Sequence, residues 1–134
     1  MLLPRLRPIF GLLIALVLAT GPADLRAEGT GLQLLMVEDR GCPACRQWRA
    51  EVLPDYQAHP QGRAAPLMMV GVDGPWPNGL ALARRPQITP TFILLRNGQE
   101  VSRVEGYAGQ AHFWPVLAKM LQDEAVQRTR GDGT

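Results

Sequence analysis

Short apolar runs divide the chain, and three of them have the length expected of a buried β-strand. They occupy residues 32–37, 66–72 and 91–96. Asn97-Gly98 follows the third run and is the strongest short signal for a hairpin, so residues 99–105 are expected to return as an antiparallel strand. This returning strand is the most polar of the set, which predicts a position nearer the edge of the sheet.

Two further stretches carry apolar residues at helical spacing, which predicts amphipathic helices that pack on the sheet. The first spans residues 43–53 and should end or kink at Pro54, because a proline in a helix interior costs about 3 kcal/mol. The second covers residues 113–121 and should carry Pro115 in its first turn or bend there.

The segments between these elements carry weaker signals. Residues 59–62 and the Pro- and Gly-rich residues 73–79 are predicted to be loops, and residues 80–85 one or two helical turns. Residues 127–134 are polar and predicted to be a frayed tail. The predicted order is β-α-β-(short α)-β-β-α, an α/β fold in one domain over residues 28–126.

The N-terminus has the features of an export signal. Arg5 and Arg7 precede a nearly continuous apolar run at residues 9–19, and small, turn-forming residues follow. This order predicts a secretory signal peptide over residues 1–27, with a cut after Ala23 as the alternative. An uncleaved membrane anchor is less favoured, because the run is about half of the roughly 20 residues that a spanning helix needs.

The charge balance argues against a nucleic-acid or anionic-membrane partner. Removal of residues 1–27 takes away three of the 14 basic and one of the 12 acidic side chains, which leaves 11 of each sign. The predicted mature chain is therefore formally neutral, so its net charge gives it no general attraction to polyanions.

Cys42-Pro43-Ala44-Cys45 contains the only two cysteines of the chain, at the junction of a predicted strand and helix. A disulfide across two residues closes almost no loop and stabilises the fold little, so this spacing favours a redox-active pair over a structural disulfide. The positive end of the helix dipole would favour thiolate at Cys42, and Pro43 suits a first helical turn. Disulfide-exchange proteins use this arrangement.

Other uses of a C-x-x-C motif find little support. Arg46 follows Cys45 where covalent haem attachment requires histidine. A zinc site needs four ligands, and the two histidines of the chain are far apart in the sequence. His59 is expected to be solvated, and His112 is expected to lie beside a helix start. We therefore expect no metal and no cofactor.

The cysteine pair, Thr89-Pro90-Thr91 and a hairpin followed by Gly106 occur in the order and spacing of the thioredoxin family, which the chain resembles over residues 32–121. The resemblance implies a minimal thioredoxin fold: a central mixed sheet flanked by helices, with a cis-proline at Pro90 facing the cysteines. Residues 38–48 are most similar to small periplasmic thioredoxin-like proteins, including those encoded with bacterial sulfur-oxidation (Sox) systems.

The resemblance also implies roles for individual residues. Cys42, exposed at the helix start, would attack a partner's disulfide, and the more buried Cys45 would resolve the mixed disulfide. The Thr89 backbone would pair with the partner's extended segment, with Pro43 and Ala44 beside it. Apart from the resemblance, Trp76 in a predicted surface loop is a candidate for partner contact, and local packing is the equally weighted alternative.

One position departs from the family pattern. Thioredoxins carry a buried aspartate six residues before the first cysteine, where this chain has Met36. Glu38 is the candidate replacement as proton acceptor if its side chain turns inward. The alternative is that Glu38 and Asp39 are both solvated turn residues.

The function predicted from the resemblance is that of a periplasmic thiol-disulfide oxidoreductase that reduces or reactivates a partner protein's disulfide or modified cysteine. Its electrons would come from a membrane thiol transporter of the DsbD or CcdA type. A DsbA-like oxidant is one alternative, because proline follows the first cysteine there too. A non-catalytic copper- or thiol-binding chaperone is the other. A monomer is expected, although a missing opening strand would leave a sheet edge free for pairing.

Overall fold

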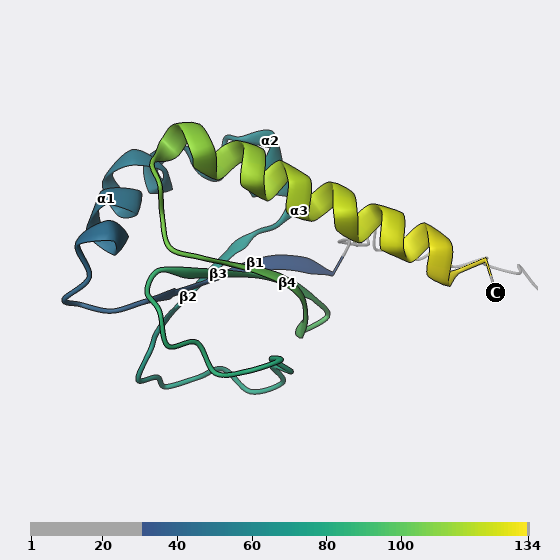
Figure 1. The fold of residues 1–134 in the computed structure, drawn as a ribbon, viewed down its shortest axis with the longest axis horizontal. Helices are drawn as coiled ribbons and strands as arrows, with labels where there is room; N and C mark the ends of the chain where they lie inside the picture. Colours follow the sequence, from purple (N-terminus) through teal and green to yellow (C-terminus); the bar gives the residue numbers. More distant parts are fainter. Residues whose placement is uncertain (1–30, 134) are drawn as a thin grey trace, which may run out of the picture.

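The structure, a computed structural model, describes residues 31–133, so the predicted signal peptide and its cleavage site lie outside the described residues. The elements in chain order are β1 (Leu32–Glu38), α1 (Pro43–Glu51), the short 3-10 helix η1 (Leu53–Asp55), α2 (Pro60–Ala64), β2 (Leu67–Gly71), β3 (Thr91–Arg96), β4 (Gln99–Glu105) and α3 (Gln110–Gly131) (Figure 1). Within this part of the chain, no helix is long and apolar enough to cross a membrane.

The strands form a four-stranded mixed sheet in the order β2-β1-β3-β4. β1 runs parallel to β2 and antiparallel to β3, and β3 pairs with β4 through the predicted hairpin. All four predicted strands are confirmed. The expectation that the second strand is buried is wrong, because β2 lies at an edge and only Val70 is buried in it.

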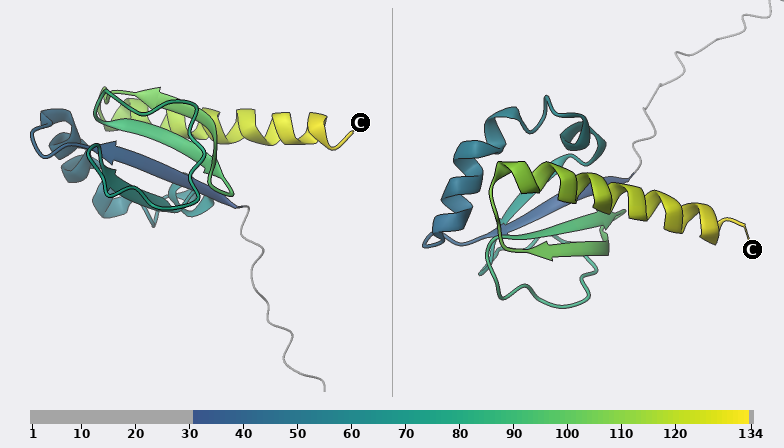
Figure 2. Two further views of the ribbon diagram at one scale, coloured as in Figure 1. Left: turned by 90° about the horizontal axis from the view of Figure 1, so that it is seen from below. Right: turned by 45° about the horizontal axis from the view of Figure 1, so that its top comes forward.

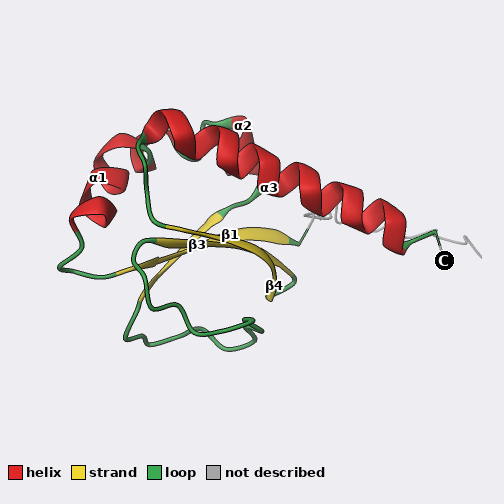
Figure 3. Cartoon of the chain, in the orientation of Figure 1, coloured by secondary structure: helices red, strands yellow, loops and turns green. Residues whose placement is uncertain are grey.

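The helices all lie on one face of the sheet, and an irregular segment, residues 72–90, covers the other (Figures 2 and 3). Alternate residues of β1 supply both sides: Leu34 and Met36 pack with the helices, whereas Leu35 and Val37 pack with the irregular segment. The expected mixed sheet is therefore present, but helices flank it on one face only.

Residues 59–62 are not the predicted loop, because α2 begins at Pro60. Proline is well suited to this first helical position, where its missing N–H is not needed. Gly62 is required by packing, since a Cβ there would lie 1.7 Å from the Tyr56 carbonyl oxygen. His59 is not solvated either: its ring is half-buried and stacks on Trp114 with centroids 3.6 Å apart.

Residues 80–85 form no helical turn, contrary to prediction. Their backbone instead bonds to the β3–β4 hairpin: the Ala81 N–H donates to the Gly98 carbonyl, and the Ala81 carbonyl accepts from the Glu100 N–H, both at 2.9 Å. The Ala83 N–H donates to the Glu100 carboxylate at 2.8 Å. These tertiary hydrogen bonds take the backbone groups that a helix would have used.

The polar tail predicted from residue 127 is helical as far as Gly131, because α3 continues through it. Glu124, only 6% exposed, forms an ion pair with Arg96 of β3 and holds this end of α3 to the sheet. Extending an existing helix costs little, and Arg128 and Arg130 suit the negative end of its dipole.

Candidate active site around the Cys42–Cys45 disulfide

Cys42 and Cys45 are joined by a disulfide at the N-terminus of α1, with their Cα atoms 5.2 Å apart. Cys42 is the N-cap residue, and its Sγ accepts a hydrogen bond from the Cys45 N–H at 3.0 Å. Pro43 occupies the first helical turn. In the reduced protein the same N–H and the helix dipole would stabilise negative charge on the Cys42 sulfur.

The two sulfurs differ in access. Cys42 is 7% exposed and Cys45 1%, so the prediction of an exposed Cys42 is wrong in this disulfide form, although Cys42 remains the more accessible. Gly41 and Pro43 beside it are exposed, and Ala44 is half-buried. A partner therefore reaches the Cys42 sulfur more readily than the Cys45 sulfur.

Trp48 holds α1 against the sheet and thereby fixes the cysteines. It is completely buried, and its ring contacts Phe92, Phe113 and Tyr56 with centroid distances of 5.6, 5.6 and 6.2 Å. Aromatic pairs at these tilted geometries add specific attraction to the burial of their area. The disulfide thus belongs to the same buried hydrophobic cluster as Trp48.

Pro90 lies at the end of the sheet where β1 leads to the cysteines. Thr91 is paired with Val37, so the start of β3 lies beside the end of β1, from which the chain continues to Cys42. The Thr89–Pro90 peptide bond is cis, Pro90 is buried and Thr89 is half-buried. The Pro90 carbonyl accepts the Gly106 N–H at 2.7 Å, which ties this segment to the β4–α3 loop.

Glu38 ends β1 with its carboxylate in a two-point ion pair with Arg49 of α1. The hydrogen bond to Glu38 raises the pKa of the Arg49 guanidinium. Glu38, Arg49 and Cys45 all line one polar cleft of about 700 Å³. Met36 is completely buried and offers no group that could accept a proton, whereas this cleft brings carboxylates to the side of the resolving cysteine.

Asp39 and Trp76 have other surroundings. Asp39 is exposed and its Oδ1 accepts the Gly41 N–H at 3.3 Å, which fits a turn residue. Trp76 packs against the loop-covered face with the Arg85 guanidinium 5.6 Å from its ring centre, whereas both cysteines belong to the helix-covered core. The structure does not bring Trp76 together with the disulfide.

Sequence reasoning missed Arg49 and the contact of Gly106 with Pro90. Arg49 lies one helical turn after Cys45, so helical spacing alone could have placed it on the side of the resolving cysteine. The Gly106 contact depends on the pairing of β3 with β4 and had no local signal. Residues 31–133 contain no cluster of three or more His, Cys, Asp or Glu side chains that could hold a metal ion.

Residues 22–121 match the family model of the thioredoxin-like domain. The periplasmic thioredoxin SoxS from Paracoccus pantotrophus, solved in its reduced form, is 45% identical, with a TM-score of 0.66 over 68% of this chain and 96% of that one. A protein called Trxlp from Edwardsiella tarda is 26% identical, with a TM-score of 0.49 over 66% of this chain and 82% of that one. No curated protein matches the chain.

A C-x-x-C disulfide on this fold defines a thiol-disulfide oxidoreductase, which acts on disulfides of partner proteins. The chain belongs to the thioredoxin-like family, as its sequence led us to expect.

Proposed function

We propose that this protein works in the periplasm as a reductant that restores disulfide-bonded or otherwise modified cysteines of a partner protein. The observation that carries the proposal is the unequal access of the two sulfurs, with Cys42 at the N-cap and Cys45 beneath it. Its similarity to SoxS, a periplasmic thioredoxin, and the signal-like N-terminus support the location.

The reaction has two exchange steps. The Cys42 thiolate attacks one sulfur of the partner's disulfide, the partner's other sulfur leaves as a thiolate, and a mixed disulfide forms. The Cys45 thiolate then attacks Cys42 Sγ and releases the partner's remaining sulfur as a thiolate. Two electrons pass to the partner, which becomes a dithiol, while the protein retains the Cys42–Cys45 disulfide.

The second step requires Cys45 to lose its proton in a nearly closed core. We assign Glu38 as the acceptor, because it lines the same cleft as Cys45 and Met36 offers no basic group. Arg49 orients the Glu38 carboxylate through its two-point contact. Water in the cleft would carry the proton between the two side chains.

The partner is expected to dock over Pro43 and Ala44 and to pair with the backbone of Thr89, which precedes buried Pro90. Trp76 would serve partner contact only outside this surface, because it packs on the opposite face of the sheet. Regeneration needs a source of two electrons. A membrane thiol transporter of the DsbD or CcdA type would supply them, as the family resemblance implies.

The reduction potential of the Cys42–Cys45 pair tests the direction of electron flow. Equilibration with glutathione buffers should give a value at or below about −230 mV, near the thioredoxins and glutaredoxins. A value near about −120 mV would overturn the reductant proposal and favour an oxidant of the DsbA kind.

Trapping tests the roles of the two sulfurs. Cys45→Ser should accumulate a mixed disulfide with the partner in periplasmic extract, and Cys42→Ser, its matched control, should trap nothing. A trapped species with Cys42→Ser alone would assign the attack to Cys45 instead.

A further inference from the structure

The described residues expose only three large apolar side chains, of which one precedes Pro90 in the chain and two lie on α3. Ile88 is 51% exposed and lies two residues before Pro90, and Val116 of α3 is 37% exposed. Val126, 50% exposed, lies three turns further along α3. Apolar surface beside a reactive site marks a place for a partner more often than isolated exposed residues do.

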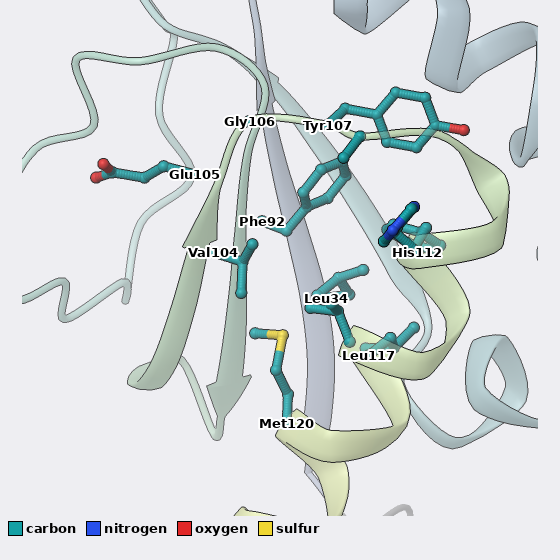
Figure 4. A pocket seen from close by; sticks show the side chains of 12 residues that line it. Leu34, Phe92, Val104, Glu105, Gly106, Tyr107, His112, Leu117 and Met120 are labelled. Carbon is teal, nitrogen blue, oxygen red and sulfur yellow. The ribbon is translucent and has the colours of Figure 1, made fainter.

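Val116 borders a cavity of about 210 Å³ between the sheet and the first half of α3. Figure 4 shows Leu34, Phe92 and Val104 of the strands, with Leu117 and Met120 of α3, arranged around one space. The Tyr107 hydroxyl points out of this space and donates to Glu51 at 2.5 Å. The walls are therefore mostly hydrocarbon, with Glu105 and His112 as the charged or polar groups of the lining.

The cavity lies next to the segment that carries Pro90. Gly106, Tyr107 and Ala108 line the cavity, and the Gly106 N–H is bonded to the Pro90 carbonyl. A partner segment that pairs with Thr89 and reaches Cys42 would therefore have to cross only the loop of residues 106–108 to reach the cavity. A free small molecule or a second copy of the protein would have no such reason to combine the two sites.

We infer that the cavity receives one bulky apolar side chain, of leucine or phenylalanine size, from the extended segment that carries the partner's reactive cysteine. This inference rests on the proposed function, since it assigns a specificity site to the same exchange reaction. A polar side chain would lose its water against walls that are mostly hydrocarbon, so the cavity would favour an apolar one.

The test uses short Ser/Gly peptides with one cysteine, held as a mixed disulfide with thionitrobenzoate. A single phenylalanine is moved through the positions on either side of the cysteine. Attack by Cys42 on the peptide sulfur releases the coloured thionitrobenzoate anion, which reports the second-order rate constant. At one position, phenylalanine should raise this constant roughly tenfold over serine, the usual scale of discrimination by an apolar pocket.

Val116→Trp narrows the mouth of the cavity and should abolish the phenylalanine preference. Val126→Trp is the matched control, with the same substitution at an exposed position of the same helix, and should retain it. Val116→Asp provides a second variant that leaves the volume nearly unchanged but makes the mouth charged. Val126→Trp should react normally with 2-hydroxyethyl disulfide, which is small and polar, as measured by the loss of protein thiols, and near-UV circular dichroism should show that all three variants are folded.

The inference fails if no position shows a preference, if Val116→Trp keeps it, or if Val126→Trp loses it equally. It also fails if the wild-type protein forms a dimer that Val116→Trp dissociates in sedimentation, because a second copy would then occupy the cavity. Failure of the proposed function would look different: the reduced wild-type protein would react with neither peptide nor 2-hydroxyethyl disulfide. Binding of the same peptides with serine in place of cysteine, compared across the variants, would then still decide whether the cavity selects an apolar side chain.

Discussion

The two faces of the sheet are closed in different ways, although the strands supply apolar side chains to both. The helix-covered face packs Trp48, Tyr56, Phe92 and Phe113 into one aromatic cluster that includes both cysteines. The other face is covered by residues 72–90, in which Val72, Trp76, Leu80 and Leu82 remain partly exposed.

On the loop-covered face, hydrogen bonds and ion pairs hold the covering segment to the sheet. Arg103 donates to the Glu100 carboxylate at 2.6 and 2.7 Å and to the Arg84 carbonyl at 2.8 Å, which ties β4 to the covering segment. Arg84 in turn pairs with Glu105. The disulfide is thus held by rigid packing, whereas the segment leading to Thr89 and Pro90 is held by ion pairs and hydrogen bonds.

The largest difference between the two faces should appear when a tryptophan is removed from each. Trp48→Ala should lower the free energy of unfolding by about 3–5 kcal/mol, because it leaves a cavity where the side chain is completely buried. Trp76→Ala should lower it by roughly 1 kcal/mol, since that side chain is partly exposed. Urea unfolding measures both, and equal losses would remove the distinction between the faces.

The cleft beneath Cys45 adjoins the start of the covering segment, and its carboxylates can be tested one at a time. Glu38→Gln should slow the resolution of the mixed disulfide by roughly 10²-fold, the usual contribution of a positioned proton acceptor. Reduced protein reacts with dithiobis(nitrobenzoate) in two phases. Cys42 attacks the reagent and releases one thionitrobenzoate, and Cys45 then attacks Cys42 Sγ and releases the second. Only the second phase should slow.

Asp39→Asn is the matched control for Glu38→Gln, because Asp39 lines the same cleft but serves as a turn residue. It should leave both phases unchanged. If Asp39→Asn slows the second phase and Glu38→Gln does not, the proton acceptor has been assigned to the wrong carboxylate.

Arg103→Met tests whether ion pairs hold the loop-covered face. The substitution removes the main partner of Glu100, whose side chain is nearly buried. It should lower the free energy of unfolding by roughly 1–3 kcal/mol at neutral pH, which lies between the contributions of exposed and of buried ion pairs. Arg84→Met, at a more exposed pair, should cost less. Urea unfolding of the two variants ranks these contributions.

The cost of Arg103→Met should depend on pH. The hydrogen bond from Arg103 holds the pKa of Glu100 below its ordinary value of 4.5. A lowered folded-state pKa contributes stability that is present above the unfolded-state pKa and is lost as the pH falls through the folded one. The difference between wild type and Arg103→Met should therefore shrink below pH 4.5, and a constant difference would contradict this origin.

The smallest effect is expected from the polar link on the helix-covered face. The Tyr107 hydroxyl donates to Glu51 and thereby lowers the pKa of that carboxylate. Burial, and then this bond, raises the pKa of Tyr107. Tyr107→Phe should slightly lower the melting temperature at neutral pH and have less effect in acid, once Glu51 is protonated. A loss as large as that of Arg103→Met would show that polar links matter equally on both faces.

The fold and the cysteine site were largely predictable because their signals are local. Apolar runs of strand length and Asn97-Gly98 correctly predicted the strands and hairpin, and the C-x-x-C spacing correctly predicted the pair at the start of α1. Errors occurred where a segment takes its structure from distant groups. Residues 80–85 bond to the hairpin instead of forming a turn of helix, and His59 stacks on Trp114.

By itself, the sequence determined the strands, the position of the cysteine pair and its family, because hydrophobic periodicity and turn chemistry act over a few residues. Only the tertiary structure decided which face the helices cover, that Glu38 pairs with Arg49, and that a cavity lies beside Gly106 and Pro90. Each of these depends on which distant side chains come to lie together. Burial and hydrogen bonding between such groups outweigh the weak local preferences that a single sequence reveals.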